Sequence, residues 1–210
     1  MKIVQASARI AAHSMDMLET IELCGRVCYK SEDRICEGSA EKMIGSLMDK
    51  HHESVIEHGS ITVHIICDRG VSHELVRHRL ASFSQESTRY CNYSKDKFGS
   101  DVAFIDIRGG FPDISDDSYF GWKNSCAASE AAYMEMLSIG GSTAQEARSV
   151  LPNSLKTEMY MTANPREWRH IFKMRTAKSA HPQAREVMIP LLHEFQAKWP
   201  VLFNDIKELA

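Results

Sequence analysis

Apolar residues recur at helical spacing along much of the chain. Between residues 14 and 29, apolar side chains follow one another at intervals of three or four, and a similar pattern follows Ser39. Because such positions share one face of a helix, both stretches predict amphipathic helices, capped by Ser14 and Ser39. The longest stretch of this kind, residues 117–139, stops at Gly140, a residue type that commonly ends a helix.

Further helices are predicted towards the C-terminus. A capping box at residues 142–146 begins a short helix that Pro152 ends. Asn164 is followed by a proline and, three positions on, by a glutamate, so a helix is expected to begin there. Residues 182–198 also carry apolar side chains at helical spacing, and Pro190 is expected to kink this helix.

Strands are predicted where apolar and polar residues alternate. Residues 60–67 and 155–162 both alternate, and residues 101–107 do so more weakly. A turn after the first of these strands leads into a helix expected from Ser72. Long helices mixed with a few separated strands are typical of the α+β class. We find no linker and no internal repeat, so residues 1–210 are expected to form a single domain.

Composition narrows the class of protein further. The 210 residues are 43% hydrophobic and 25% charged, which argues against disorder, collagen and coiled coil. No run approaches the ~18 consecutive apolar residues of a membrane span, and the first seven residues lack the apolar core of a signal peptide. Six cysteines include no Cys-x-x-Cys pair, which favours free thiols in a reducing compartment. We therefore expect a cytoplasmic protein that does not bind a membrane.

The formal net charge is −3, but positive charge is concentrated in two places. Residues 69–90 contain four arginines and two glutamates, and residues 148–185 contain eight lysines or arginines and two glutamates. Two cationic regions in an otherwise acidic chain favour a small anionic ligand, phosphate above all, over long nucleic acid. Solvated helix faces are one alternative. A single-strand binder is another, because Phe83, Tyr90 and Tyr93 lie among these arginines.

The densest group of functional side chains lies in residues 77–90. Successive residues of a helix are about 100° apart, so Arg77 and Arg79 on one helix would point apart and could not share one ligand. Either the helix has ended there, or the two arginines bind different anions. If the end of this segment is extended, Ser87 and Arg89 face the same side and offer a hydroxyl and a guanidinium to one anion. An exposed polar connection is the alternative interpretation.

Metal and nucleophile sites are not supported by residue spacing. The zinc-binding helix of metalloproteases needs histidines four apart, but the residue four positions after His52 is Ile56. Cys91 and Ser87 have no identifiable base, and the glycine fingerprint of a Rossmann dinucleotide site is absent. The residues alone therefore indicate an enzyme or a binder of phosphorylated small molecules, without a metal.

Motifs over most of the chain resemble those of one family. Arg77-His78-Arg79, followed after seven residues by Ser87 and then by Thr88-Arg89-Tyr90, resembles the signature of the flavin-dependent thymidylate synthases, the ThyX family. Four further motifs of that family occur in the expected order, namely His52-Glu53-Ser54 with Glu57-His58, Arg148-Ser149-Val150-Leu151-Pro152, Asn164-Pro165-Arg166 and Arg175.

This resemblance implies a fold and an activity. The fold is expected to be α+β, with long helices around a small mixed or antiparallel sheet and no Rossmann topology. The activity is the conversion of dUMP to dTMP, with methylenetetrahydrofolate as one-carbon donor, FAD reduced by NADPH as hydride source, and no covalent enzyme nucleophile. Family members are homotetramers whose active sites are shared between subunits, with small molecules and no nucleic acid as ligands. A flavoprotein that kept the fold and lost the synthase activity is the alternative.

The resemblance also assigns site residues. Arg175 is expected to be catalytic at the uracil edge, where a fixed cation favours loss of the N3 proton. Three departures from the family pattern occur: Ser84-Gln85 for the common Asn-Glu, His170 for a frequent Asn, and the run at residues 181–184. The expected FAD contacts are Ser54, Arg77, His78, Arg79, Gln85, Asn164, Arg166 and His170. The expected dUMP contacts are Glu74, Arg77, Gln85, Glu86, Ser87, Arg89, Arg148 and Arg175.

Overall fold

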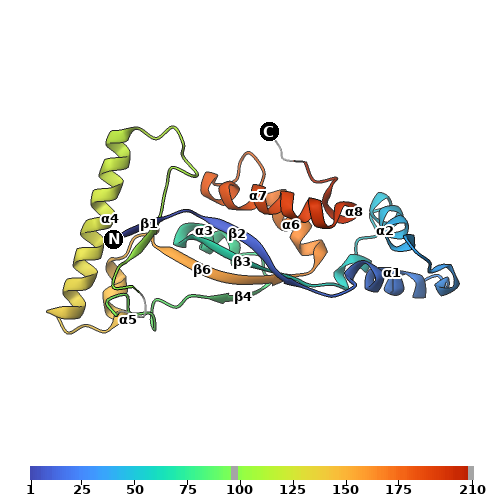
Figure 1. Ribbon diagram of the computed structural model, residues 1–210, viewed down its shortest axis with the longest axis horizontal. Coiled ribbons are helices and arrows are strands. Elements are labelled where there is room, and N and C mark those ends of the chain that lie inside the picture. The colour runs from blue at the N-terminus through green and yellow to red at the C-terminus, as the bar shows by residue number, and fades with distance from the viewer. Residues whose placement is uncertain (96–98, 208–210) are drawn as a thin grey trace. The chain divides into compact units, whose positions relative to one another are not determined.

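The computed structural model describes residues 1–95 and 99–207 and contains two compact units (Figure 1). Unit 1 consists of Met1–Ser7, Ile65–Arg77 and Ser84–Met159. Unit 2 consists of Ala8–His64, His78–Phe83 and Tyr160–Ala210. Each unit is therefore assembled from three separate segments of the chain, and each is described below by itself.

Helices and two small sheets make up the fold, which confirms the predicted α+β class. One sheet has the strand order β2-β3-β6-β4, and the other pairs β1 with β5 in parallel, Lys2 with Ala103 through Val4 with Ile105. The strands are β1 (Lys2–Val4), β2 (Ser7–His13), β3 (Ile61–Asp68), β4 (Ser82–Gln85), β5 (Ala103–Ile105) and β6 (Lys156–Ala163). The helices are α1 (Met17–Val27), α2 (Ser39–Asp49), α3 (Arg69–Leu75), α4 (Asp116–Ser138), α5 (Ala144–Ala147), α6 (Pro165–Arg175), α7 (Pro182–Lys198) and α8 (Pro200–Phe203), with short 3-10 helices at Glu32–Arg34, Val55–Glu57 and Arg148–Val150.

The core of unit 1 lies against the long helix α4, drawn yellow-green in Figure 1. Only Cys126 and Tyr133 of this helix are buried, and they pack with Val102, Phe104 and Leu155. The Tyr133 hydroxyl accepts a hydrogen bond from the backbone N–H of Tyr93 at 3.2 Å, so its polar end is satisfied inside the core. The amphipathic pattern predicted for residues 117–139 therefore gives a helix that buries two side chains fully along its length.

The core of unit 2 is an aromatic cluster on α6, α7 and α8, the orange and red helices of Figure 1. Trp168 and Phe172 of α6 meet Phe195 of α7 and Phe203 of α8, with ring centroids between 5.0 and 6.0 Å apart. The Trp168 indole N–H donates to the carbonyl of Ile61 in β3 at 3.0 Å. Since α6 is anchored to β3 in this way, its polar face is held in a fixed orientation.

Local sequence signals predicted two helix starts correctly. The Asn164 side chain accepts a hydrogen bond from the Glu167 backbone N–H at 2.8 Å and caps α6, whose first residue is the expected proline. Thr143 and Glu146 form the expected capping box at the start of α5. Both signals depend only on residues three apart, so the surrounding fold does not alter them.

The two predicted serine caps are wrong. Helix α1 begins at Met17 after Asp16, and the Ser14 hydroxyl instead accepts from the backbone N–H of Ser60 at 3.0 Å. Helix α2 has Gly38 at its N-cap with φ of 70°, and Ser39 is its first residue.

The helix start predicted at Ser72 is also wrong. Helix α3 begins at Arg69, because the side chain of Asp68 accepts from the backbone N–H of Val71 at 2.6 Å and caps the helix three residues earlier. The strands β1, β2 and β4 were not predicted; β1 and β4 are only 3 and 4 residues long, too short for a clear alternation.

Candidate functional site

The residues assigned from the sequence fall into two groups, one in each unit. Unit 1 holds every expected nucleotide contact except Arg175, and unit 2 holds every expected flavin contact except Arg77 and Gln85. Helix α3 ends at Leu75, so Arg77 and Arg79 lie beyond it, in different units. Of the two alternatives above, the one in which the helix has ended is therefore confirmed.

In unit 1, buried hydroxyls fix the side chain of Gln85. Its amide nitrogen donates to the Thr157 hydroxyl at 3.1 Å and to the Ser72 hydroxyl at 3.0 Å, and both partners are buried. An amide has two N–H donors and one acceptor oxygen. Both donors are used inside the protein here, which leaves the carbonyl oxygen of Gln85 as the group that a ligand can contact.

The neighbouring Glu86 carboxylate belongs to a charged network. It accepts from the Tyr93 hydroxyl at 2.8 Å and from the Lys156 ammonium at 3.0 Å, and Lys156 also contacts Glu158 at 2.8 Å. Burial, followed by the charge of Glu86, raises the pKa of Tyr93. Burial opposes the charged form of Lys156, but the two carboxylates outweigh it, and the pKa of Lys156 is raised. These contacts hold the Glu86 side chain in one position.

The segment after β4 is a turn, so the conditional prediction of an extended Ser87–Arg89 pair is wrong. The backbone N–H groups of Tyr90 and Cys91 donate to the Ser87 carbonyl at 3.1 and 2.9 Å, which closes the turn. The Nε–H group of Arg89 donates a hydrogen bond to the side-chain oxygen of Gln145, in α5, at 2.9 Å. A hydroxyl and a guanidinium therefore do not lie on one face of a strand here.

Arg148 lines a pocket of about 240 Å³ in unit 1. Its guanidinium donates to the Thr88 hydroxyl at 3.1 Å, which joins the signature segment to the 3-10 helix that follows α5. Arg69 and His73 line the same pocket, and none of the lining residues within 1–95 and 99–207 is a carboxylate. Two guanidinium groups around one small pocket suit a phosphate. Arg69 and His73 were missed because no spacing in the sequence connects them with Arg148.

The two remaining unit 1 residues lie on or just beyond α3. Glu74 is half-buried on the helix, and Arg77 is exposed, with its backbone N–H donating to the Glu74 carbonyl at 3.3 Å. They are therefore placed by α3 rather than by the turn that carries Arg89.

In unit 2, three expected flavin contacts line a pocket of about 630 Å³: Asn164, Arg166 and His170. The Asn164 oxygen is occupied in capping α6, so its NH2 group is the one left for a ligand. Arg166 contacts the carboxylates of Glu57 at 2.6 Å and Glu53 at 3.7 Å. The pocket also contains Lys173, Glu167 and Arg169, which the sequence did not single out. It therefore offers nitrogen donors of both charged and neutral kinds.

Ser54 and Arg79, the other unit 2 residues of the flavin group, are exposed. Ser54 precedes the 3-10 helix Val55–Glu57, and its carbonyl accepts from the Glu57 backbone N–H at 3.2 Å. Arg79 precedes Leu80, which lines the 630 Å³ pocket.

A buried histidine connects the signature to the late arginine. The Nε2 atom of His78 accepts a hydrogen bond from Arg175 Nε at 3.1 Å, and its Nδ1 atom lies 3.5 Å from a carboxylate oxygen of Glu167. Burial, then the charges of Arg175 and His170, lower the pKa of His78 to about 4. His78 is therefore neutral near pH 7, and the accepting Nε2 places its proton on Nδ1. A neutral acceptor orients the guanidinium of Arg175 without cancelling its charge.

In residues 1–95 and 99–207, no group of three or more His, Cys, Asp or Glu side chains is arranged to hold a metal ion. No helix in the same ranges combines the length and the apolarity needed to cross a membrane.

The fold and these residues define an α+β protein with a cationic pocket in unit 1 and a pocket of mixed charge in unit 2. A family model described as "Thymidylate synthase complementing protein" matches residues 9–201, and the chain belongs to this family, Thy1. The resemblance drawn from the sequence motifs is thereby confirmed.

Relatives from distant sources match over most of the chain. A flavin-dependent thymidylate synthase of Geobacter sulfurreducens is 30% identical over 92% of this chain and 83% of its own length. One from Pyrococcus furiosus is 33% identical over 84% of this chain and 73% of its own length. The crystal structure of the UMP/dUMP methylase PolB from Streptomyces cacaoi, bound with 5-Br dUMP, has a TM-score of 0.77 and 25% identity, covering 97% of this chain and 96% of that one.

The neutral state of His78 gives a prediction about pH. Its pKa in the folded protein lies below the usual 6.5, so protonation favours the unfolded chain. The contribution of His78 to stability is therefore present above pH 6.5 and is lost as the pH falls from 6.5 to about 4. Titration of the His78 ring by NMR, assigned with a His78→Gln variant, should give a midpoint near 4. A midpoint near 6.5 would contradict this description of the site.

Proposed function

We propose that this protein is a thymidylate synthase that converts dUMP to dTMP with the help of bound FAD. The observation that carries the proposal is the hydrogen bond between His78 and Arg175, 97 residues apart in the sequence. This hydrogen bond joins the Arg-His-Arg signature to the late arginine. In the sequence, only the resemblance to the family connected these two motifs. Relatives named flavin-dependent thymidylate synthase, matching over most of the chain, support the same function.

Unit 1 supplies most of the proposed contacts to dUMP. Arg148 faces a pocket without carboxylates, and Arg89 lies on the turn next to Thr88, which contacts Arg148. We assign the nucleotide phosphate to these arginines with Ser87, because guanidinium–phosphate hydrogen bonds are among the strongest available in water. The Gln85 carbonyl oxygen and the Glu86 carboxylate are acceptors for N–H and O–H donors of the nucleotide. Glu74 and Arg77 complete the proposed set.

Unit 2 supplies most of the proposed contacts to FAD. The residues present fit this cofactor, because Asn164, Arg166 and His170 place nitrogen donors around one pocket of sufficient size. We propose that these three hold FAD, together with Ser54, Arg77, His78, Arg79 and Gln85. Bound FAD, reduced by NADPH, supplies a hydride, and the protein supplies orientation and charge.

Arg175 is the proposed catalytic residue. A fixed guanidinium at the uracil edge stabilises the imide anion that remains when the N3 proton leaves. The negative charge is shared with C5, which becomes nucleophilic towards the methylene carbon of methylenetetrahydrofolate. Because His78 is neutral, its hydrogen bond does not compensate the positive charge of Arg175. No side chain needs to form a covalent bond with the base.

We also propose a homotetramer in which active sites are shared between subunits. Leu80 and Tyr90, within and at the end of the signature, are each 77% exposed. Large apolar side chains at a site of this kind are usually covered by a ligand or by a second subunit. The same proposal includes a cytoplasmic location, which the sequence supports. It also includes NADPH as the reductant, which the resemblance to the family supports.

Spectroscopy and product analysis test the proposed function together. The purified protein should show oxidised-flavin absorbance that bleaches when NADPH is added without oxygen. It should then form dTMP from dUMP and methylenetetrahydrofolate. Bleaching without dTMP would favour a flavoprotein that has lost the synthase activity. Protein that stays colourless after addition of FAD would rule out a flavin enzyme.

The proposed role of Arg175 predicts the behaviour of Arg175→Ala. The variant should fold and retain flavin that NADPH reduces, but kcat for dTMP should fall by about 10²–10³-fold, the usual loss when one charge-stabilising group is removed. Lys178→Ala is the matched control, since Lys178 is an exposed cation three residues further along. Turnover of Arg175→Ala close to that of the control would exclude the proposed role.

A further inference from the structure

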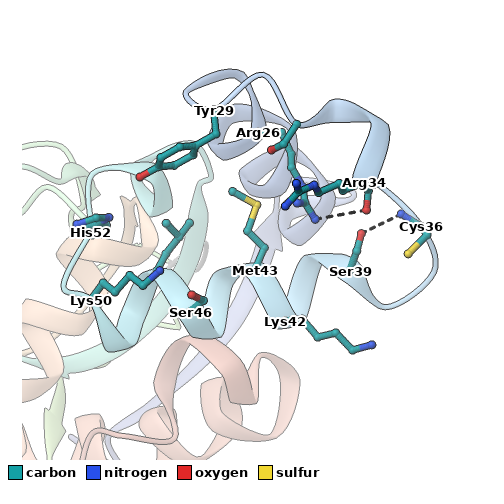
Figure 2. Close-up of a pocket in the computed structure, with 12 residues that line it drawn as sticks. Arg26, Tyr29, Arg34, Cys36, Ser39, Lys42, Met43, Ser46, Lys50 and His52 are labelled. Atoms are coloured by element: carbon teal, nitrogen blue, oxygen red, sulfur yellow. Dashed lines mark hydrogen bonds between the residues drawn. The ribbon is translucent and has the colours of Figure 1, made fainter.

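Unit 2 contains a second pocket, of about 640 Å³, between α1 and α2 (Figure 2). None of the residues assigned above to dUMP or FAD lines it. Arg26, Arg34, Lys42 and Lys50 contribute four positive charges to its lining, and among the described residues no aspartate or glutamate belongs to the lining. A concave site with an excess of positive charge attracts an anionic ligand.

The four cations are not equivalent. Arg26 is paired with the buried carboxylate of Glu22 at 2.5 Å, and the Ser39 hydroxyl donates to the same carboxylate at 2.8 Å. In the ranges 1–95 and 99–207, no ion pair involves the side chain of Arg34, Lys42 or Lys50. Arg26 therefore serves to hold the pocket together, and the other three carry charge that a ligand can neutralise.

Hydrogen bonds fix the loop that carries Arg34 over this pocket. The Arg26 guanidinium donates to the Arg34 carbonyl at 3.5 Å, and the Cys36 backbone N–H donates to the Ser39 hydroxyl at 3.0 Å, both drawn as dashed lines in Figure 2. The loop is thus tied to α1 at one point and to α2 at the other. Its arginine is held near the pocket before any ligand binds.

The lining between the charges combines apolar side chains with serine hydroxyls. In the view of Figure 2, the Met43 side chain lies between Arg34 on one side and Lys50 and His52 on the other. Leu47 and Tyr29 also line the pocket. A pocket of about 640 Å³ is much larger than a compact ion such as inorganic phosphate. Several cations with apolar side chains among them fit a larger molecule that carries several anionic groups.

The pocket is next to the proposed flavin pocket along the chain. His52 lines the pocket between α1 and α2, and the following residue, Glu53, lines the pocket of Asn164 and Arg166. Both pockets are in unit 2. The linings of the two pockets therefore come within one residue of each other along the chain, and this connects the two pockets.

We propose that the pocket between α1 and α2 binds the polyanionic tail of a co-substrate that reacts beside the flavin. The inference rests on the proposed function, which supplies two co-substrates of this chemistry. The glutamate carboxylates of methylenetetrahydrofolate and the phosphates of NADPH both place several negative charges along an extended molecule. Arg34 and Lys50 recognise these charges from the two ends of the pocket.

Steady-state kinetics of the double variant Arg34→Gln/Lys50→Gln test the proposal in the holoenzyme. The KM of one co-substrate should rise by about 10-fold or more while kcat stays within about twofold, because the tail contributes binding and no chemistry. If the tail is a folate tail, wild type should prefer pentaglutamylated over monoglutamylated methylenetetrahydrofolate, and the variant should lose that preference. If it is a nucleotide tail, only the KM of NADPH should rise.

The matched control is Arg9→Gln/Lys30→Gln, which removes two exposed cations of the same unit that do not line the pocket. Its KM values should stay at the wild-type level. Equal increases in both double variants would show a general charge effect and would overturn the proposal. Unchanged KM values for both co-substrates in Arg34→Gln/Lys50→Gln would overturn it as well.

A direct titration separates this inference from the proposed function. Wild-type protein, with its flavin, should bind penta-γ-glutamate or tripolyphosphate about 10-fold or more tightly than Arg34→Gln/Lys50→Gln, in a salt-dependent manner. If wild type binds such a probe but makes no dTMP, the proposed function fails and the anionic pocket stands. If it makes dTMP but the variant binds both probes as tightly as wild type, the pocket proposal fails alone.

Discussion

The hydrogen bond from Arg175 to the buried, neutral His78 is the contact on which the proposed chemistry depends. A charged partner such as a carboxylate would hold Arg175 equally well, but it would neutralise the cation that the reaction needs. A neutral imidazole gives orientation and leaves the charge in place. Its neutrality has physical causes within unit 2: the ring is buried, and the charges of Arg175 and His170 both oppose a proton on it. The aromatic core supports this arrangement, because Trp168 anchors α6, the helix that ends with Arg175, to β3.

The two units contribute different chemistry. Unit 1 combines a small cationic pocket at Arg148 with a Glu86 carboxylate that is fixed by Lys156 and Tyr93, a combination suited to a phosphate and a hydrogen-bonding base. Unit 2 has two larger pockets, one lined by His52 and the other by Glu53; the charged side chains of the second are mixed in sign, and those described for the first are all cations. The signature segment is divided between the units after Arg77 and again after Phe83. We attribute the proposed alternation of ligand contacts along residues 77–90 to this division.

The sequence predicted those features whose cause is local. The caps of α5 and α6 depend on side chains three residues apart, and the α+β class follows from the mixture of periodicities. Ser39 was misread as a cap because its hydroxyl is used by Glu22, a buried residue 17 positions away, and no local pattern contains that contact. The extended form expected after β4 failed for a similar reason, since the turn is closed by backbone hydrogen bonds that any residue could make. The site residues were assigned from motifs of the family. The other cations line their pockets only once the chain has folded: Arg69 lines the pocket of Arg148, Lys173 lines the pocket of Asn164, and a third group lines the pocket between α1 and α2.

In this proposal the charge of Arg175 stabilises the N3-deprotonated form of the bound pyrimidine, and the N3 proton passes to solvent. NMR of dUMP labelled with ¹⁵N at N3, bound to the holoenzyme near pH 7, measures this most directly. We predict the ¹⁵N shift of a deprotonated imide in the wild type and of a protonated imide in a variant whose Arg175 is replaced by glutamine. A protonated N3 in the wild-type complex, or the same shift in both proteins, would contradict the account.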